Sequence, residues 1–161
     1  MVEINKTITL KLIFLISIIA LASAFFVEYI LGHQPCNLCI LERIPYLLAL
    51  IIIVLNYKFV YLEKYFILFL ILIFLAATVL SLYHLGIEQG YIEESLVCDL
   101  KNGSNLLSKE DILRQLHEKN VSCKDVTFKI LGLSLTNYNI MISILIVYFT
   151  TRAYLNYGKN K

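Results

Sequence analysis

Four long uncharged stretches restrict what this sequence can fold into. The chain has 161 residues, of which 59% are hydrophobic and 16% are charged, and the charged residues are clumped between the apolar runs. A soluble domain carries about 25% charged residues. About 20 apolar residues are enough to cross about 30 Å of hydrocarbon as a helix. The sequence therefore predicts an all-α, polytopic membrane protein embedded in a lipid bilayer. It has no acidic or basic tail of the kind that would indicate binding to nucleic acid, so no such binding is predicted.

The apolar stretches predict a single membrane domain, a bundle of four transmembrane helices. The predicted spans are about 8–31, 40–57, 65–87 and 130–151, and the predicted outward loops are about 32–39 and 88–129. The second span is short, because its strictly uncharged part covers only 44–57. It reaches full length only if Glu42 and Arg43 enter the membrane interface. A signal peptide cleaved near Ala24 is an alternative for the first run, but the run continues to Leu31, which favours a retained span.

The basic residues predict which side of the membrane each loop faces. The two ends of the chain and the connection between the second and third spans together hold seven basic and two acidic residues. The loop 88–129 holds six basic and eight acidic residues. The positive-inside rule then predicts that both termini are cytoplasmic and that both cysteine-bearing loops face outward. Within the second loop, Ser108 to Asp111 has the pattern of a capping box, which predicts a short amphipathic helix there.

All four cysteines lie in the two outward loops. Cys36 and Cys39 are three residues apart, so on a helical turn they share a face and are able to form a disulfide. A Cys-x-x-Cys pair at a helix N-terminus lowers the pKa of its first thiol. Cys98 and Cys123 enclose 24 residues and form either a structural staple or a second redox pair, and three pairings of the four cysteines stay open. A metal site is disfavoured, because a four-cysteine zinc site usually has two close pairs.

Three charged or titratable residues near the thiols are candidates for function. Arg43 follows Cys39 by one helical turn, and a charge at membrane depth needs a partner. That partner is either Glu42, a lipid phosphate, or a thiolate on Cys39. His84, near the outer end of the third span, is either functional or a plain interfacial histidine. Glu28 is expected to extend its side chain toward the interface.

Several motifs resemble the DsbB family of membrane disulfide-bond oxidoreductases. They are "QPCNLCILER" at 34–43, "YHLGIEQG" at 83–90, "FKILGLSL" at 128–135, and the segments around Cys98 and Cys123. The resemblance covers nearly the whole chain, and its first motif is specific. It implies a four-helix bundle in the bacterial inner membrane and a bound quinone, either ubiquinone or menaquinone. It also implies a periplasmic thioredoxin-fold partner similar to DsbA.

The resemblance also implies a role for each cysteine. Cys36 and Cys39 would be the pair coupled to the quinone, with Cys39 as the thiolate that faces it. Cys98 would exchange with the cysteine of the partner protein, and Cys123 would resolve the mixed disulfide. The relay would be a series of thiol–disulfide exchanges, in each of which a thiolate attacks a sulfur.

Arg43 and His84 would lie at the quinone, by the same resemblance.

Two alternatives to a DsbB-like enzyme remain. One is an oxidase similar to vitamin K epoxide reductase, which normally carries its Cys-x-x-Cys pair at the start of a late helix, unlike this chain. The other is a non-enzymatic membrane protein whose cysteines form staples or bind zinc.

Overall fold

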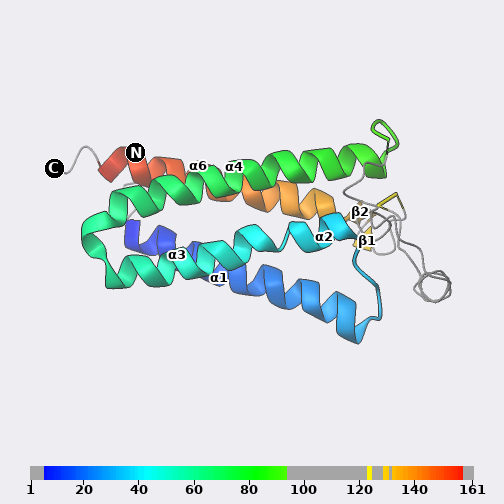
Figure 1. Ribbon diagram of the computed structural model, residues 1–161, viewed down its shortest axis with the longest axis horizontal. Helices are drawn as coiled ribbons and strands as arrows, with labels where there is room; N and C mark the ends of the chain where they lie inside the picture. The colour runs from blue at the N-terminus through cyan, green and yellow to red at the C-terminus, as the bar shows by residue number, and fades with distance from the viewer. Residues whose placement is uncertain (1–5, 94–122, 125–128, 131, 158–161) are drawn as a thin grey trace, which may run out of the picture.

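Four long helical segments run along one another in the computed structural model, which describes residues 6–93, 123–124, 129–130 and 132–157 (Figure 1). All four are long and apolar enough to cross a membrane, and they are Thr7–Ile30, Asn37–Lys58, Val60–Glu88 and Leu135–Asn156. The prediction of an all-α membrane protein with four spans is therefore confirmed. The amphipathic helix predicted near 108–116 lies outside the described residues.

The spans are built from several elements, because three of them are interrupted or extended by short turns. In chain order the elements are α1 (Lys6–Phe25), a π-helical turn η1 (Phe26–Ile30), α2 (Asn37–Leu41), α3 (Ile44–Lys58), a 3₁₀ turn η2 (Val60–Leu62), α4 (Glu63–Glu88), β1 (Lys129–Ile130), β2 (Leu133–Ser134) and α6 (Leu135–Tyr157).

The helices pair closely in two places. α4 packs along α6 over much of its length, and α1 packs on α3. α1 begins and α6 ends at the end of the bundle where α3 connects to α4 (Figure 1). The start of α2, the end of α4 and both strands lie at the opposite end. The Cys-x-x-Cys motif at the start of α2 and the strands that precede α6 therefore meet at one end of the bundle.

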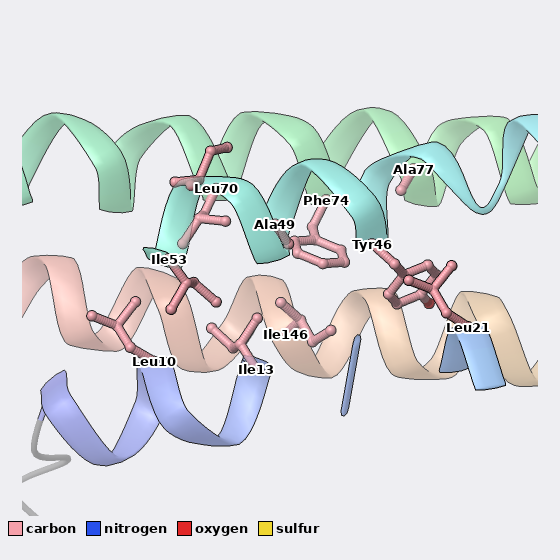
Figure 2. Close-up of a cluster of buried hydrophobic side chains, with 11 residues drawn as sticks. Leu10, Ile13, Leu21, Tyr46, Ala49, Ile53, Leu70, Phe74, Ala77 and Ile146 are labelled. Carbon is pink, nitrogen blue, oxygen red and sulfur yellow. The ribbon is translucent and has the colours of Figure 1, made fainter. Parts of the chain in front are cut away.

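An apolar core fills the middle of the bundle. Ile13 from α1, Ile53 from α3, Phe74 from α4 and Ile146 from α6 are all at most 1% exposed and pack in one cluster (Figure 2). Many other apolar side chains point away from the protein, as a helix surrounded by lipid requires. Because lipid is as apolar as these residues, the helices associate through close packing and through the polar contacts described below.

Two breaks in the helices occur near the cysteine pair. The π turn η1 holds Glu28, and Gly32 follows with a φ of 72°, a left-handed conformation that glycine adopts without a steric penalty. In the second span, Glu42 and Arg43 form a turn between α2 and α3. Pro45 has no amide hydrogen to donate to the carbonyl one turn earlier, so it interrupts the helix there and starts a new one.

The fourth span begins later than its predicted start at residue 130. The antiparallel strands β1 and β2 pair Lys129 with Ser134, and α6 starts only at Leu135. Gly132, with a φ of 84°, occupies the turn between the strands. A side-chain hydrogen bond of 3.0 Å from Asn137 to Ser134 then links the first turn of α6 to the strand before it. Apolar composition alone did not reveal this hairpin.

Candidate active site

Cys36 is the N-cap residue of α2, so its sulfur lies at the positive end of a helical turn. Its backbone is extended, with φ −71° and ψ 168°, and its sulfur accepts a hydrogen bond of 3.3 Å from the backbone N–H of Cys39. The chain enters this position from Pro35, which favours an extended conformation before the helix. The local sequence thus places both thiols on one turn, as their spacing predicted.

The two sulfurs are in contact and in the reduced form. Cys36 Sγ and Cys39 Sγ are 2.8 Å apart, and Cys36 is buried whereas Cys39 is half-buried. The hydrogen bond from the Cys39 thiol lowers the pKa of Cys36 to about 5, burial opposes this shift, and His84 adds to it. The direction of this shift is the one that the Cys-x-x-Cys spacing predicts.

His84 is fully enclosed and joins the thiols to a carboxylate. Its Nε2 lies 3.5 Å from Cys36 Sγ, and its Nδ1 lies 2.9 Å from Glu42 Oε1. Thr136 Oγ1 is 3.4 Å from the same Nδ1 and donates its own hydrogen to Glu88 at 2.5 Å. His84 is 2% exposed, so the interpretation of a plain interfacial histidine is wrong.

Asn139 connects this cluster to the apolar core. Its amide nitrogen donates to Glu42 Oε2 at 3.0 Å and to Ser81 Oγ at 2.8 Å, and its oxygen accepts a hydrogen bond from the Tyr46 hydroxyl. The ring of Tyr46 packs edge-on against Phe74 in the core, with the centroids 5.6 Å apart (Figure 2). A continuous set of polar contacts thus runs from Cys36 to the centre of the bundle.

Arg43 pairs with Glu28 from η1, and the positions of the two residues in the sequence did not predict this contact. Arg43 Nη1 and Glu28 Oε2 are 2.5 Å apart, and the guanidinium lies 5.1 Å from the ring centre of Phe25. The expectation that Glu28 extends toward the interface is wrong, because Arg43 neutralises its charge within the protein. Glu42 is not the partner of Arg43 either, since its carboxylate is used by His84 and Asn139.

A cavity of about 200 Å³ lies beside the thiols, and its wall combines apolar and polar groups. α1 contributes Leu21 and Ala24, and α6 contributes Ile142. The polar part of the wall holds most of the predicted site residues. The predicted site residues in the wall are Cys36, Cys39, Arg43, His84 and Cys123. Other polar residues of the wall are Glu28, His33, Glu42, Tyr46, Glu88, Thr136 and Asn139.

The cavity fits the ring of the expected quinone. An apolar cavity of about 150 Å³ holds a benzene molecule, so this one has room for a single substituted ring. Among the described residues, the Nε of Arg43 is buried without a hydrogen-bond partner. Such an atom has lost its hydration and favours a bound acceptor, and a quinone carbonyl is one. The tail of a quinone would have to extend into the surrounding lipid.

Cys123 lies beside the first cysteine pair. It is 3% exposed and belongs to one buried cluster with Cys36, Leu38 and Ile87. It takes part in a disulfide. Cys98, its expected partner, lies outside the described residues. Cys123 thus lies close to the first cysteine of the other pair, although 86 residues separate the two positions in the sequence.

Several residues of this site were missed in the sequence. Glu42 was interpreted as an interface residue and as a possible partner of Arg43, and Asn139, Thr136 and Glu88 were not considered as site residues. The available signal was the position of Glu42 and Asn139 inside apolar spans, because polar groups at membrane depth usually pair with one another. Their partners are not visible in the sequence, since Glu42 and Asn139 are 97 residues apart.

Comparison with known proteins agrees with this geometry. The family model of the disulfide bond formation protein DsbB matches residues 6–152. The chain is also similar to an uncharacterized protein, RP370, of Rickettsia prowazekii (strain Madrid E), with 35% identity over 149 residues that cover 89% of this chain and 84% of the relative. No solved structure shows a significant match. The chain therefore belongs to the DsbB family of membrane disulfide bond formation proteins.

Proposed function

We propose that this protein reoxidises a periplasmic DsbA-like thiol oxidase and passes the electrons to a membrane quinone. The observation that supports this most is the shared cavity. It brings a reduced Cys-x-x-Cys pair, Cys123 and the side chain of Arg43 to one place at the end of four membrane-spanning helices. Membership of the DsbB family supports disulfide oxidoreductase activity and favours it over a vitamin K epoxide reductase-like enzyme.

The first exchange transfers the partner's electrons to the second cysteine pair. A thiolate of the reduced partner attacks Cys98 in a Cys98–Cys123 disulfide, and Cys123 leaves as a thiolate. The partner's second thiolate then breaks the mixed disulfide. The partner becomes oxidised, and Cys98 and Cys123 become a dithiol, so two electrons have moved.

The second exchange transfers these electrons to the first pair. The Cys123 thiolate attacks Cys36 in the oxidised Cys36–Cys39 pair, and Cys39 leaves as a thiolate beside the cavity. Cys98 then attacks Cys123, which restores the second disulfide and releases Cys36. The contacts that lower the pKa of Cys36 make it a good leaving group in this last step. The close packing of Cys123 and Cys36 supports this order of attack.

Oxidation of the first pair completes the cycle. When bound, the quinone supplies the final acceptor, taking two electrons and two protons. The guanidinium of Arg43, which lines the cavity, would hold the quinone by a hydrogen bond, and Glu28 fixes that guanidinium through Nη1. His84 and Glu42 form a hydrogen-bonded pair at the cavity wall, where they are able to hold a proton near the sulfurs. Closure of the Cys36–Cys39 disulfide requires little movement, because the sulfurs are already in contact.

The proposed location is the bacterial inner membrane, with both termini cytoplasmic and both cysteine loops in the periplasm. Basic residues at the ends of the chain and between the second and third spans support this orientation. The start of α1, the end of α6 and the α3–α4 connection all lie at one end of the bundle, which agrees with it (Figure 1). Cys36, Cys39 and Cys123 lie at the other end.

Trapping the partner tests this function and the orientation together. In Cys123→Ala, Cys98 is a free thiolate that attacks the disulfide of the oxidised partner, and no Cys123 thiolate is present to attack Cys98 and release the partner. We therefore expect a partner-linked species on a non-reducing gel of cell extracts. Cys98→Ala is the matched control, and it should give no such species. Because the partner is periplasmic, trapping also requires the second loop to face the periplasm.

Two results of this experiment would count against the proposal. Trapping by Cys98→Ala but not by Cys123→Ala would reverse the two roles. No partner-linked species in either variant, with both proteins present at the wild-type level, would contradict the exchange with an external thiol oxidase.

A further inference from the structure

A cluster of three metal-binding side chains lies at the cavity in the reduced protein. The donor atoms of Cys36, Cys39 and His84 all lie within 4.8 Å of one another. Cys36 and His84 are buried, and Cys39 borders the cavity. Two thiolates and an imidazole form the ligand set of a three-residue zinc site that keeps a fourth position open. This set differs from a zinc site built from the four cysteines.

The distance from Cys36 to His84 agrees with one tetrahedral ion, and the distance between the two sulfurs requires one rotation. Zinc binds sulfur at about 2.3 Å and histidine nitrogen at about 2.0 Å, which places sulfur and nitrogen ligands about 3.5 Å apart. Cys36 Sγ and His84 Nε2 are 3.5 Å apart. The two sulfurs are 2.8 Å apart and must separate by about 1 Å, because two zinc-bound sulfurs lie about 3.8 Å apart. Cys39 is half-buried and borders the cavity, so its side chain is the one that would rotate.

The surroundings of His84 prepare its Nε2 as a ligand. The two groups beside His84 Nδ1, the Glu42 carboxylate and the Thr136 hydroxyl, both accept a hydrogen bond from this nitrogen. Glu42 is a carboxylate 2.9 Å away, and Thr136 uses its own hydrogen to donate to Glu88. The Nδ1 therefore carries a hydrogen, and the Nε2 is the atom that faces Cys36. A carboxylate that accepts a hydrogen bond from the second nitrogen is the usual support of a histidine bound to zinc.

We propose that reduced Cys36 and Cys39, together with His84, bind one Zn²⁺ ion, and that this ion blocks the thiol chemistry of the pair. Cys36 and His84 share one proton and Cys39 holds another, so binding of the ion releases two protons. No electron is transferred in this step. Thiolate ligands favour zinc over Mg²⁺ or Ca²⁺. The oxidised pair offers no thiolate, so the site exists only in the reduced state, and occupied thiolates are no longer free to form the disulfide.

Cobalt(II) is a suitable probe, because thiolate ligation gives it a charge-transfer absorption that zinc lacks. The full-length protein in detergent is reduced under nitrogen, freed of reductant and titrated with Co²⁺ and then with Zn²⁺. We expect one Co²⁺ per chain, displacement by Zn²⁺, and no binding by the oxidised protein. A Cys98→Ser/Cys123→Ser variant should bind the same single ion, because it keeps only the first pair.

Variants in that two-serine background identify the ligands. Cys39→Ser and His84→Ala should each weaken Co²⁺ binding at least about a hundredfold, and Glu42→Gln should weaken it about tenfold to a hundredfold. His33→Ala is the matched control, because His33 lines the same cavity but is outside the donor cluster, and it should bind Co²⁺ like the parent. Circular dichroism of each variant checks the helical fold.

The proposal is contradicted if the two-serine variant binds no Co²⁺, or if His84→Ala and Cys39→Ser bind it as tightly as their parent. Neither result bears on quinone reduction, because the titration uses no quinone and no partner protein. A failure of the metal site is therefore distinguishable from a failure of the proposed function.

Discussion

Arg43 is the residue whose role the structure changes most. It is held at 2.5 Å by Glu28 and lies over Phe25, yet its Nε lacks a partner among the described residues. The guanidinium is thus bound by the protein through Nη1, and the Arg43 side chain also lines the cavity. An arginine that served only as an anchor to the membrane interface has no need of a carboxylate partner within the protein, so the geometry favours a role at the cavity.

Substitution of Arg43 should slow quinone reduction. We expect Arg43→Ala to reduce the rate about a hundredfold, the usual cost of one lost donor to a developing charge. Arg43→Lys keeps the charge but loses the planar set of donors, so a loss of about tenfold is expected. The rates are measured at several quinone concentrations with purified protein, beside the yield of partner mixed disulfide, which should not change.

The double variant Arg43→Ala/Glu28→Gln separates two explanations of that loss. Arg43→Ala leaves the Glu28 carboxylate unpaired, which by itself disturbs the site. Replacing Glu28 by glutamine removes that charge. If Arg43 acts on the quinone, the double variant stays as slow as Arg43→Ala. Recovery of the wild-type rate would show that Arg43 serves only to neutralise Glu28.

The Cys36 thiol should titrate well below the usual range of a cysteine. Its pKa of about 5 means that the thiolate predominates above pH 5 and that exchange through Cys36 weakens below it. Ultraviolet thiolate absorbance of reduced, chelator-treated Cys98→Ser/Cys123→Ser protein should therefore show one thiolate appearing near pH 5. Cys39→Ala removes the largest cause of the shift, so its midpoint should move toward that of an ordinary thiol. A midpoint above pH 8 in the parent would contradict this assignment.

At the scale of the elements, short interruptions position the site. The π turn η1 carries Glu28, and the turn between α2 and α3 carries Glu42 and Arg43. π-helical turns occur often at functional sites, because the extra residue rotates the side chains that follow. Pro45 explains the break in the second span from the sequence. The π turn has no comparable local signal, and its contact with Arg43 spans 15 residues.

Asn139 ties α6 to both α3 and α4, so its loss should destabilise the bundle. Asn139→Leu leaves Tyr46, Glu42 and Ser81 each without one hydrogen-bond partner. We expect a loss of about 1–2 kcal/mol in the free energy of unfolding, since single polar contacts between membrane helices contribute about that much at most. Unfolding in mixed detergent micelles, followed by circular dichroism, measures it.

Met141→Leu is the control for that substitution, because Met141 lies on the same helix and is 59% exposed. It should unfold like the wild type. Equal stability of Asn139→Leu and wild type would show that the polar contacts of Asn139 do not hold the helices together.

At the scale of the whole molecule, the four spans were predictable and the contacts between them were not. Uncharged length identifies a span, and the spacing of Cys36 and Cys39 identifies a shared helical face, because both signals are local. The pairing of Glu42 with His84 depends on how α2 and α4 pack, which no local pattern encodes. The hairpin before α6 was missed for a related reason, since its apolar residues Ile130 and Leu133 extend the apolar run of the helix and their pairing across the turn leaves no local pattern.

The residues of the apolar core and the residues of the candidate site occupy different parts of the bundle along its length. The apolar cluster of Figure 2 joins the helices in the middle of the bundle, and the polar residues gather at the end where α2 starts. Tyr46 belongs to both regions, through its ring and its hydroxyl. This arrangement places the sulfurs of the described cysteines at one end of the bundle, where the proposed function requires them to meet both the partner protein and the quinone.

The most direct test of the central claim is the stoichiometry of quinone reduction. Purified protein is mixed without oxygen with a reduced DsbA-like partner and a soluble quinone, and quinone absorbance and partner thiols are followed together. We predict one quinone consumed for every two partner thiols oxidised, and no quinone consumed by Cys39→Ser. Oxidation of the partner without loss of quinone, or normal quinone loss in Cys39→Ser, would contradict the account.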